Sequence, residues 1–393
     1  MEILWISNGH GEDLNASLIL QALRQNAPEI QLRAMPLVGM GNAYQKLQVK
    51  IICPTQNLPS GGIIYTNPVN WLKDIYSGLI ELTIQQIKSL LSYRHQVDFV
   101  VAVGDIVPIA FAYITGKPFV AFIVSTSAYY EGRLKLPWLT EFFLRSPRCR
   151  AIFTRDRYTE QDLYQRGIAK AIFAGYPIMD TLSPTGQTLA WEHHHPKIAL
   201  LPGSRVPEAL ENLKLQLKLC DVLSQSQPLI FCIALVPSIT SEDLQQLAHQ
   251  ENWEFLPPNQ LRKKNCQVYG YWNAFADILH QCDGAIGMAG TAVEQAVGLG
   301  KPIIQMPGNG PQFTYAFAEA QMRLLGPSVI TIDPNLQEME LLTQAAETLW
   351  QVLADQAFLE ECQKNGLERV GIAGGSWGIA HKIKQLMVNY DPR

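Results

Sequence analysis

The sequence predicts an α/β protein built from two doubly wound, Rossmann-like domains, and three observations lead to this fold class. Short apolar runs, typical of buried parallel strands, alternate with amphipathic segments along nearly the whole chain. Turns rich in glycine and polar residues follow several of these runs. A polar stretch over residues 181–196 then separates two halves, and the second half restarts the pattern.

We assign residues 1–182 to the first domain and 196–375 to the second, facing each other across a ligand cleft. A last helix, within 376–393, is expected to cross back to the first domain. Three adjacent histidines, residues 193–195, cannot all face one metal ion from a regular element, so we interpret them as linker residues. The length of 393 residues allows each domain its own core.

Composition excludes several classes of protein. With 47% hydrophobic and 17% charged residues the chain is globular, and its net charge of −4 argues against a general nucleic-acid binder. The seven cysteines form no CxxC pair, so we interpret them as reduced, buried thiols of a cytoplasmic protein. The N-terminus lacks a signal peptide's basic start and no apolar run is long enough to span a bilayer, so any membrane contact is expected to be peripheral.

The first strand, residues 3–6, ends in a turn that concentrates polar side chains. Its candidate site residues are Gly9, His10, Gly11, Glu12 and Asp13. Open α/β sheets bind ligands at the carboxyl ends of their strands, which favours a functional role for this turn. A helix is predicted over 14–25, with Ser7 or Asp13 as its cap. The alternative is that Glu12 and Asp13 only cap this helix and that His10 is a solvated loop residue.

A second polar strand end follows the apolar run 99–103. Asp105 lies directly after it, where a carboxylate can act as a general base. The alternative is that Asp105 caps the helix expected to start near Pro108. Before this strand, residues 36–67 are rich in Gly, Pro and Asn and predict a long loop, and 71–93 predict a long amphipathic helix.

Residues 131–150 mix basic and aromatic side chains. Five are basic and two are acidic, and apolar residues that include Trp138, Phe142 and Phe143 are interleaved with them. Such a helix can lie on an anionic membrane surface. The alternative is a half-buried helix with a solvated basic rim.

Two glycine turns mark the second domain. After the strand 197–201, Gly203 and Ser204 precede a helix over 208–223, and Arg205 offers a planar, bidentate partner for a diphosphate. The alternative is an ordinary helix start near an arginine that binds no ligand.

The second turn follows the apolar run 282–286. Gly287 and Gly290 allow close backbone approach to a phosphate, and a helix opening at Thr291 points its N–H groups at it. Glu294 can accept hydrogen bonds from ribose hydroxyls; the alternative is an ordinary βα turn with Glu294 favoured by the helix dipole. Asn309 and Gln312 in the next strand-end loop can donate hydrogen bonds.

Five landmarks together resemble lipid-A-disaccharide synthase and its relatives, which are glycosyltransferases of the GT-B fold. The landmarks are residues 9–13, 104–105, 175–180, 200–205, and 289–294 with Lys301-Pro302. The resemblance runs through most of the chain, and the Leu-Pro-Gly-Ser-Arg and Gly-Thr-Ala-Val-Glu segments are its most specific parts. The chain departs from the family in the turn 7–11, in residues 125–132, and in the loop 306–312, which looks more like other UDP-sugar enzymes of this fold.

The resemblance implies inverting, metal-independent transfer of a sugar from a UDP-sugar to a lipid-linked acceptor, without a further cofactor. The second domain would hold the donor through Gly203, Ser204, Arg205, Gly287, Gly290, Thr291, Glu294, Asn309 and Gln312. The first would hold the acceptor, with Asp105 or His10 as the base. Two other readings stay open: a UDP-N-acetylglucosamine 2-epimerase-like isomerase, and a non-catalytic nucleotide-sugar-binding protein. Location would be cytoplasmic, with possible peripheral contact at the inner face of the cytoplasmic membrane.

Overall fold

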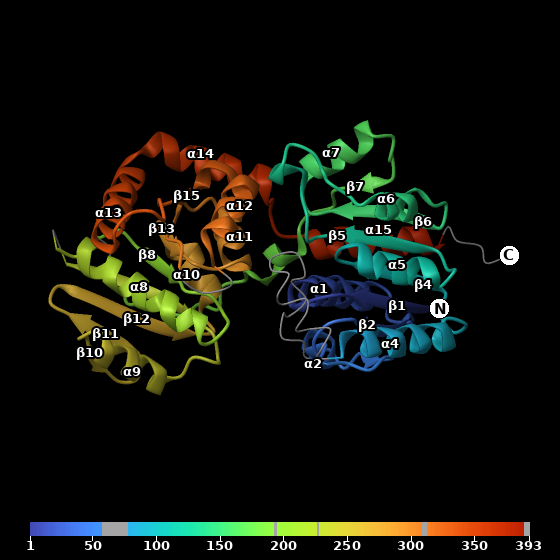
Figure 1. The fold of residues 1–393 in the computed structure, drawn as a ribbon, viewed down its shortest axis with the longest axis horizontal. Helices are drawn as coiled ribbons and strands as arrows, with labels where there is room; N and C mark the ends of the chain where they lie inside the picture. Colours follow the sequence, from blue (N-terminus) through green and yellow to red (C-terminus); the bar gives the residue numbers. More distant parts are fainter. Residues whose placement is uncertain (57–77, 192–194, 226–227, 309–312, 389–393) are drawn as a thin grey trace. The chain divides into compact units, whose positions relative to one another are not determined.

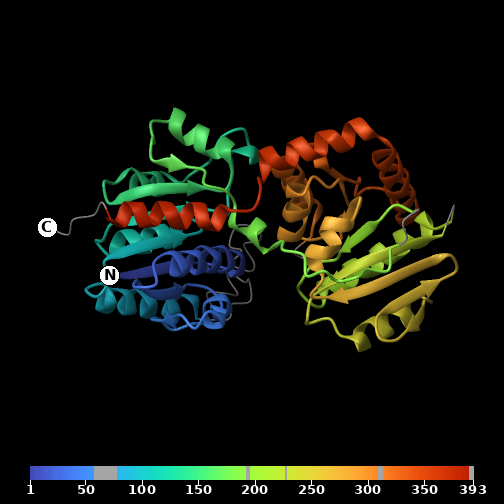
Figure 2. The same cartoon turned by 180° about the vertical axis from the view of Figure 1, so that it is seen from behind.

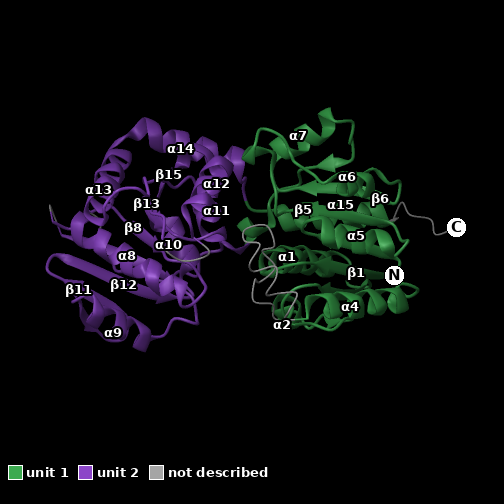
Figure 3. Ribbon diagram, in the orientation of Figure 1, with its two compact units in different colours: residues 1–180, 373–393 green, residues 181–372 purple. Residues whose placement is uncertain are grey.

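The computed structural model describes residues 1–56, 78–191, 195–225, 228–308 and 313–388 (Figure 1). The chain divides into two compact units, which Figure 3 colours separately. Unit 1 contains residues 1–180 and 373–393, and unit 2 contains residues 181–372. Both are α/β units with mainly parallel sheets, which confirms the predicted fold class of Rossmann-like domains.

Unit 1 is built on a seven-stranded parallel sheet of strand order β3-β2-β1-β4-β5-β6-β7. Its strands are β1 (Glu2–Ser7), β2 (Gln31–Pro36), β3 (Lys50–Ile51), β4 (Phe99–Val103), β5 (Phe119–Ile123), β6 (Cys149–Thr154) and β7 (Ala171–Ile172). Trp5, Phe99 and Phe122 in the central strands are completely buried. Burial on both faces of the sheet explains why these strands are continuous apolar runs rather than alternating ones.

Helices cover both faces of this sheet. They are α1 (His10–Asn26), α2 (Asn42–Lys46), α4 (Leu79–Tyr93), α5 (Ile106–Ile114), α6 (Trp138–Arg145), α7 (Arg157–Gln165) and α15 (Gly375–Val388). Figures 1 and 2 show α1 and α15 on one face, and α4, α5 and α6 on the other. The Asp180 carboxylate accepts hydrogen bonds from the backbone N–H groups of Gly374 and Ser376, and Lys384 Nζ donates to the Asn26 carbonyl at 2.6 Å. These bonds fasten the C-terminal helix to unit 1.

Two local predictions for unit 1 need correction, and a third falls partly outside the described residues. Helix α1 begins at His10 rather than at residue 14, so neither Ser7 nor Asp13 is its cap. The segment expected as one long loop contains α2 and β3 before residue 56. The amphipathic helix α4 runs from Leu79 to Tyr93, while residues 57–77, which include its expected start, lie outside the described residues.

Unit 2 is built on an eight-stranded sheet of order β10-β11-β12-β9-β8-β13-β14-β15. Its strands are β8 (Ile198–Leu201), β9 (Leu229–Leu235), β10 (Glu254–Leu256), β11 (Gln260–Lys263), β12 (Cys266–Trp272), β13 (Gly284–Gly287), β14 (Ile303–Gln305) and β15 (Val329–Thr331). Along the sheet from β12 through β9, β8, β13 and β14 to β15, all neighbouring strands are parallel. At one edge, β10 pairs antiparallel with β11, and β11 pairs antiparallel with β12. This edge hairpin was not predicted, because its strands are short and charged, as edge strands commonly are.

The helices of unit 2 are α8 (Glu208–Leu223), α9 (Ser241–Gln250), α10 (Phe275–Gln281), α11 (Thr291–Gly298), α12 (Tyr315–Leu325), α13 (Glu338–Ala354) and α14 (Gln356–Arg369). One core cluster joins the sheet to α8 and α13 through Leu213, Leu217, Phe231 and Leu349. All seven cysteines are free, and all but the half-buried Cys53 are buried. Within the described residues, no helix is both long and apolar enough to cross a membrane.

Candidate functional site

In unit 1 the sheet brings the two predicted polar strand ends together. Strands β1 and β4 are parallel neighbours, so the turn after β1 and the residues after β4 lie at the same edge. Asn8 Nδ2 donates to Asp105 Oδ1 at 2.7 Å and directly links the two ends. Gly104, with a φ of +133°, makes this approach possible, because a Cβ there would lie 2.1 Å from Asn8 Oδ1. Asn8 was not identified as a site residue from the sequence. The feature that could have identified it is its position as the first residue after a buried strand.

Asp105 both caps a helix and carries a perturbed carboxyl. Its side chain accepts a hydrogen bond from the Val107 backbone N–H at 2.9 Å, which makes it the N-cap of α5. Burial raises the pKa of Asp105, and the hydrogen bonds from Val107 and Asn8 oppose that rise. A carboxylate of raised pKa at a strand end is a better proton acceptor than an ordinary aspartate. The capping role and the base role are therefore compatible.

Asp13 belongs to a buried polar cluster rather than to a cap. Its side chain is only 2% exposed, and its Oδ1 accepts a hydrogen bond from Ser7 Oγ at 2.6 Å. Ser7 Oγ lies 2.5 Å from Tyr44 Oη on α2. Burial raises the pKa of Asp13 to about 7, and the Glu12 charge adds to the rise while the Ser7 hydrogen bond opposes it. Among the described residues Asp13 Oδ2 has no hydrogen-bond partner.

In the rest of the first turn, Gly9 is buried, Glu12 is half-buried, and His10 and Gly11 are exposed. His10 is exposed, and its ring lies beside Gly39, where a Cβ would be 3.1 Å from the ring carbon Cε1. Glu12 Oε1 accepts a hydrogen bond from Ser125 Oγ at 2.6 Å, which ties the turn after β1 to the loop after β5. A Cβ on Gly9 would meet the Glu12 carboxylate at 2.5 Å, whereas Gly11 has open space. Polar groups from three neighbouring strand ends therefore share one edge.

In unit 2 an asparagine joins the two glycine turns. Strands β8 and β13 are parallel neighbours, so both turns lie at one edge of the sheet. Asn212 on α8 is 4% exposed, and its Nδ2 donates to the Pro202 carbonyl at 2.9 Å and to the Met288 carbonyl at 3.2 Å. One turn further along α8, Gln216 Nε2 donates to the Ile286 carbonyl at 3.1 Å. These buried amides fix the spacing of the two turns.

The second glycine turn leads into α11 without a side-chain cap. Gly290 is the N-cap residue and Thr291 is the exposed first residue of the helix, so its first N–H groups lack a side-chain acceptor from the cap. Gln321 Nε2 on α12 donates to the Gly290 carbonyl at 2.9 Å, which holds the turn in place. Glu294 is half-buried one turn into the helix. Gly287 is buried within β13, where a Cβ would be 2.6 Å from a methyl group of Val293.

Arg205 and Ser204 are exposed in the turn between β8 and α8. The helix begins only at Glu208, and Glu208 Oε1 accepts a hydrogen bond from the Phe313 backbone N–H at 3.0 Å. This contact links α8 to the strand-end loop after β14. The predicted donors Asn309 and Gln312 in that loop lie outside the described residues, as do His193 and His194.

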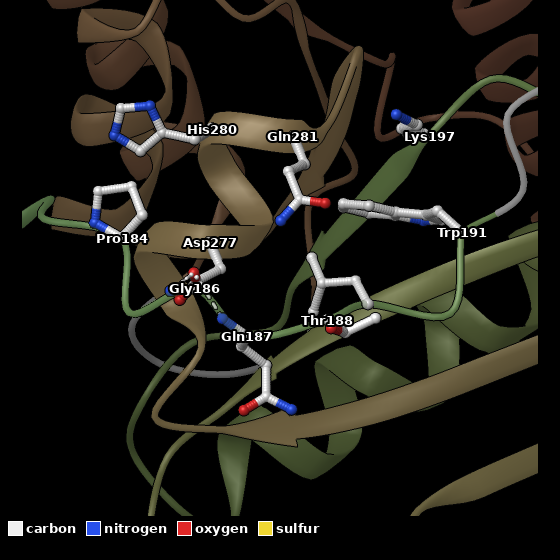
Figure 4. A pocket seen from close by; sticks show the side chains of 10 residues that line it. Pro184, Gly186, Gln187, Thr188, Trp191, Lys197, Asp277, His280 and Gln281 are labelled. Carbon is white, nitrogen blue, oxygen red and sulfur yellow. Dashed lines mark hydrogen bonds between the residues drawn. The ribbon is translucent and has the colours of Figure 1, made fainter.

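A separate cavity of about 490 Å³ lies along α10 (Figure 4). Its walls are formed by Lys197, Asp277, His280 and Gln281, and by six residues of the preceding segment: Pro184, Gly186, Gln187, Thr188, Leu189 and Trp191. Asp277 accepts hydrogen bonds from the backbone N–H groups of Thr185, Gly186 and Gln187, so its carboxylate is occupied in holding this segment on α10. None of the residues predicted for a site lines this cavity.

Several solved structures share this fold. The calicheamicin glycosyltransferase CalG4 matches with a TM-score of 0.64 at 13% identity, over 100% of this chain and 99% of its own. S. aureus MnaA, solved with UDP, matches with a TM-score of 0.60 at 12% identity, over 99% and 97% of the two chains. The UDP-GlcNAc 2-epimerase of Neisseria meningitidis, solved with UDP-GlcNAc, gives 0.57 at 15% identity, over 99% and 100%.

These neighbours are GT-B glycosyltransferases and UDP-GlcNAc 2-epimerases, and at such identities the likeness establishes the fold. No protein-family model matches the chain, and no curated protein matches it by sequence.

Proposed function

We propose that this protein is an inverting glycosyltransferase that moves a sugar from a UDP-sugar to an acceptor hydroxyl. The observation that carries the proposal is the pair of glycine turns in unit 2, which Asn212 holds together at neighbouring strand ends. Backbone N–H groups at an uncapped helix start favour a phosphate, and Arg205 in the adjacent turn favours a diphosphate. The shared fold with structures solved with UDP and UDP-GlcNAc supports the same donor class.

The donor would be bound by unit 2, without a metal ion. Arg205, Ser204 and Gly203 would meet the diphosphate from one turn, and Gly290 and Thr291 from the other. Glu294 would accept hydrogen bonds from the ribose, and Asn309, Gln312 and Gly287 complete the set inferred from the sequence. A guanidinium and helix N–H groups aimed at the leaving diphosphate would stabilise its charge as the sugar departs.

Unit 1 would supply the proton acceptor for the acceptor hydroxyl. Asp105 is favoured by its strand-end position and by its raised pKa, and His10 is the exposed alternative in the turn after β1. Gly9, Gly11, Glu12 and Asp13 would shape the acceptor side. The resemblance to lipid-A-disaccharide synthase supports a lipid-linked acceptor, an acylated or N-acetylated glucosamine donor, and work at the inner face of the cytoplasmic membrane.

The second candidate is a UDP-N-acetylglucosamine 2-epimerase-like isomerase. It is favoured by the fold match to the Neisseria meningitidis epimerase, which extends over 99% of this chain. An epimerase needs no acceptor, so incubation with UDP-GlcNAc alone separates the two candidates. Proton NMR would show a new epimer for an isomerase, and only donor or slow hydrolysis for a transferase. A mere nucleotide-sugar-binding protein would give neither product, even with a lipid extract supplied.

The donor site is tested by calorimetric titration with UDP. We expect wild-type protein to bind UDP, and Arg205→Ala to lose most of that affinity because it removes the bidentate cation. Arg262→Ala is the matched control, because Arg262 is an arginine of unit 2 that pairs with Glu254 on the edge hairpin. Unchanged UDP affinity in Arg205→Ala would remove this residue from the site, and absence of binding in wild-type protein would refute the donor class.

A further inference from the structure

Helix α6 carries an aromatic pair on its outer side. Trp138 is 79% exposed and Phe142, four residues later, is 56% exposed. The opposite side of the same helix is packed into unit 1 through Thr140, Phe143 and Leu144. Residues four apart lie on one face of a helix, so the two exposed rings form one apolar ridge. The helix is half-buried, as one of the two interpretations from the sequence expects, and its outer face is aromatic rather than only basic.

The ridge continues onto α5 beside it. The Tyr113 ring lies 6.0 Å from the Phe142 ring, between centroids, and the next residue, Ile114, is 40% exposed. Figure 1 shows α5 and α6 side by side on one face of the unit 1 sheet, and Figure 2 shows α15 on the opposite face.

The segment that carries this ridge has an excess of basic side chains. Residues 131–150 contain five basic and two acidic side chains, in a protein whose net charge is −4. Arg133 is exposed just before the ridge and has no ion-pair partner within the described part of the chain, while Lys135 pairs with Glu131. Arg148 stacks on the Tyr113 ring at 4.0 Å and donates to the Tyr113 carbonyl at 3.1 Å, so its charge is held beside the ridge.

We propose that the outer face of α6, with Trp138 and Phe142 as its anchors, docks on an anionic lipid bilayer surface. Tryptophan favours the boundary between headgroups and acyl chains, and basic residues around it are attracted to anionic lipids. A protein partner is a poorer occupant. Two aromatic side chains bury roughly 150–250 Å² each, well below the roughly 800 Å² per partner of a stable protein interface.

This surface deepens the proposed function, because it rests on a lipid-linked acceptor that unit 1 must meet at a membrane. Arg145 is unsuited to test it, since it pairs with Glu141 and donates to the Arg166 carbonyl at 2.9 Å. Reversal of that charge would disturb the helix itself. Trp138, Phe142 and Arg133 are exposed and are the sharper targets.

The test is co-sedimentation of the full chain with vesicles. We expect wild-type protein to pellet with phosphatidylcholine vesicles that contain phosphatidylglycerol, to remain soluble with phosphatidylcholine alone, and to be released by high salt. The double variant Trp138→Ala/Phe142→Ala should lose the pelleting. Arg133→Glu should lower the partition coefficient on the order of tenfold or more, because each basic charge contributes about fivefold.

Two matched controls lie away from α6, on α15 and on α2, and α2 contacts α1. Trp377→Ala removes a tryptophan that is 50% exposed on α15, and Lys46→Glu makes the same charge change on α2. Both should pellet like wild type.

Equal pelleting with both vesicle types, pelleting with neither, or pelleting retained by the double variant would overturn the proposal. Calorimetric UDP titration of the same variants distinguishes loss of membrane docking from failure of the donor site. The variants should bind UDP like wild type, since neither Trp138 nor Phe142 lies in unit 2.

Discussion

The Asp13→Asn variant should make the protein more stable at neutral and alkaline pH. In the folded protein the Asp13 carboxyl is buried with its pKa raised from 3.8 to about 7, whereas the unfolded chain titrates near the ordinary value. The folded state therefore holds the proton more tightly than the unfolded state between these two values. Stability contributed by the neutral carboxyl is fully present below pH 4 and is lost as the pH rises through 7.

The size of this effect follows from the shift. The pKa of Asp13 rises by about three, and each pKa unit corresponds to roughly 1.4 kcal/mol. The free energy of unfolding should therefore fall by about 4 kcal/mol between acidic and alkaline pH because of this one carboxyl. Asparagine has the shape of the protonated aspartate, and its carbonyl can accept the Ser7 Oγ hydrogen bond, but it carries no titrating charge. The free energy of unfolding of the variant should exceed that of wild type by about 1 kcal/mol near pH 4.5 and by about 4 kcal/mol near pH 8.

The assay is urea unfolding followed by tryptophan fluorescence, from pH 4.5 to pH 8.5, with Glu29→Gln as the control. Glu29 is an exposed acid of unit 1, so the same acid-to-amide substitution there leaves the buried Asp13 cluster intact. A stability difference between Asp13→Asn and wild type that does not grow with pH would refute the reasoning. It would mean that the carboxyl is solvated in the folded protein.

Two further predictions concern the turns at the strand ends. Asn212→Leu leaves two carbonyl oxygens without their buried donor, which should cost about 1–3 kcal/mol of unfolding free energy for each oxygen. The variant should also bind UDP more weakly in calorimetric titration. An unchanged UDP affinity would show that the two turns keep their spacing without the Asn212 amide. Gly104→Ala should destabilise the protein by about 1–3 kcal/mol, because its Cβ would displace Asn8. Gly167→Ala is the matched control, at a φ of +76° with no described atom within 4 Å, and an equal loss in both would trace the cost to backbone strain alone.

The sequence was informative wherever the structure depends on neighbours along the chain. The apolar runs 99–103 and 119–124 correspond to buried strands because a strand covered on both faces needs apolar side chains at every position. The same pattern predicted that Asp105 follows a strand. Because neighbouring parallel strands end at one edge of the sheet, it lies beside the turn after β1. The glycine turns of unit 2 were found on the same basis.

The start of α1 shows where local reasoning failed. Asp13 looked like a cap because aspartate favours that position, but the helix begins earlier and buries it. Its actual contact with Ser7 and Tyr44 depends on α2, which lies within a segment expected to be a loop. Asn212 escaped notice for a similar reason, because one amide on an amphipathic helix gives no local signal of the two distant carbonyls it binds.

By itself the sequence determined the alternation of the main strands and helices, the two-part α/β architecture and the polar character of the strand ends, but not α2, β3 or the hairpin of β10 and β11. These follow from the spacing of apolar residues and from glycine, which act within a few residues. Tertiary structure alone decided that Asp13 is buried, that Asn212 joins two turns, and that Trp138 faces outward while Phe143 faces inward. The reason is that burial and hydrogen-bond partners are set by segments far apart in the chain, which only the packed sheet brings together.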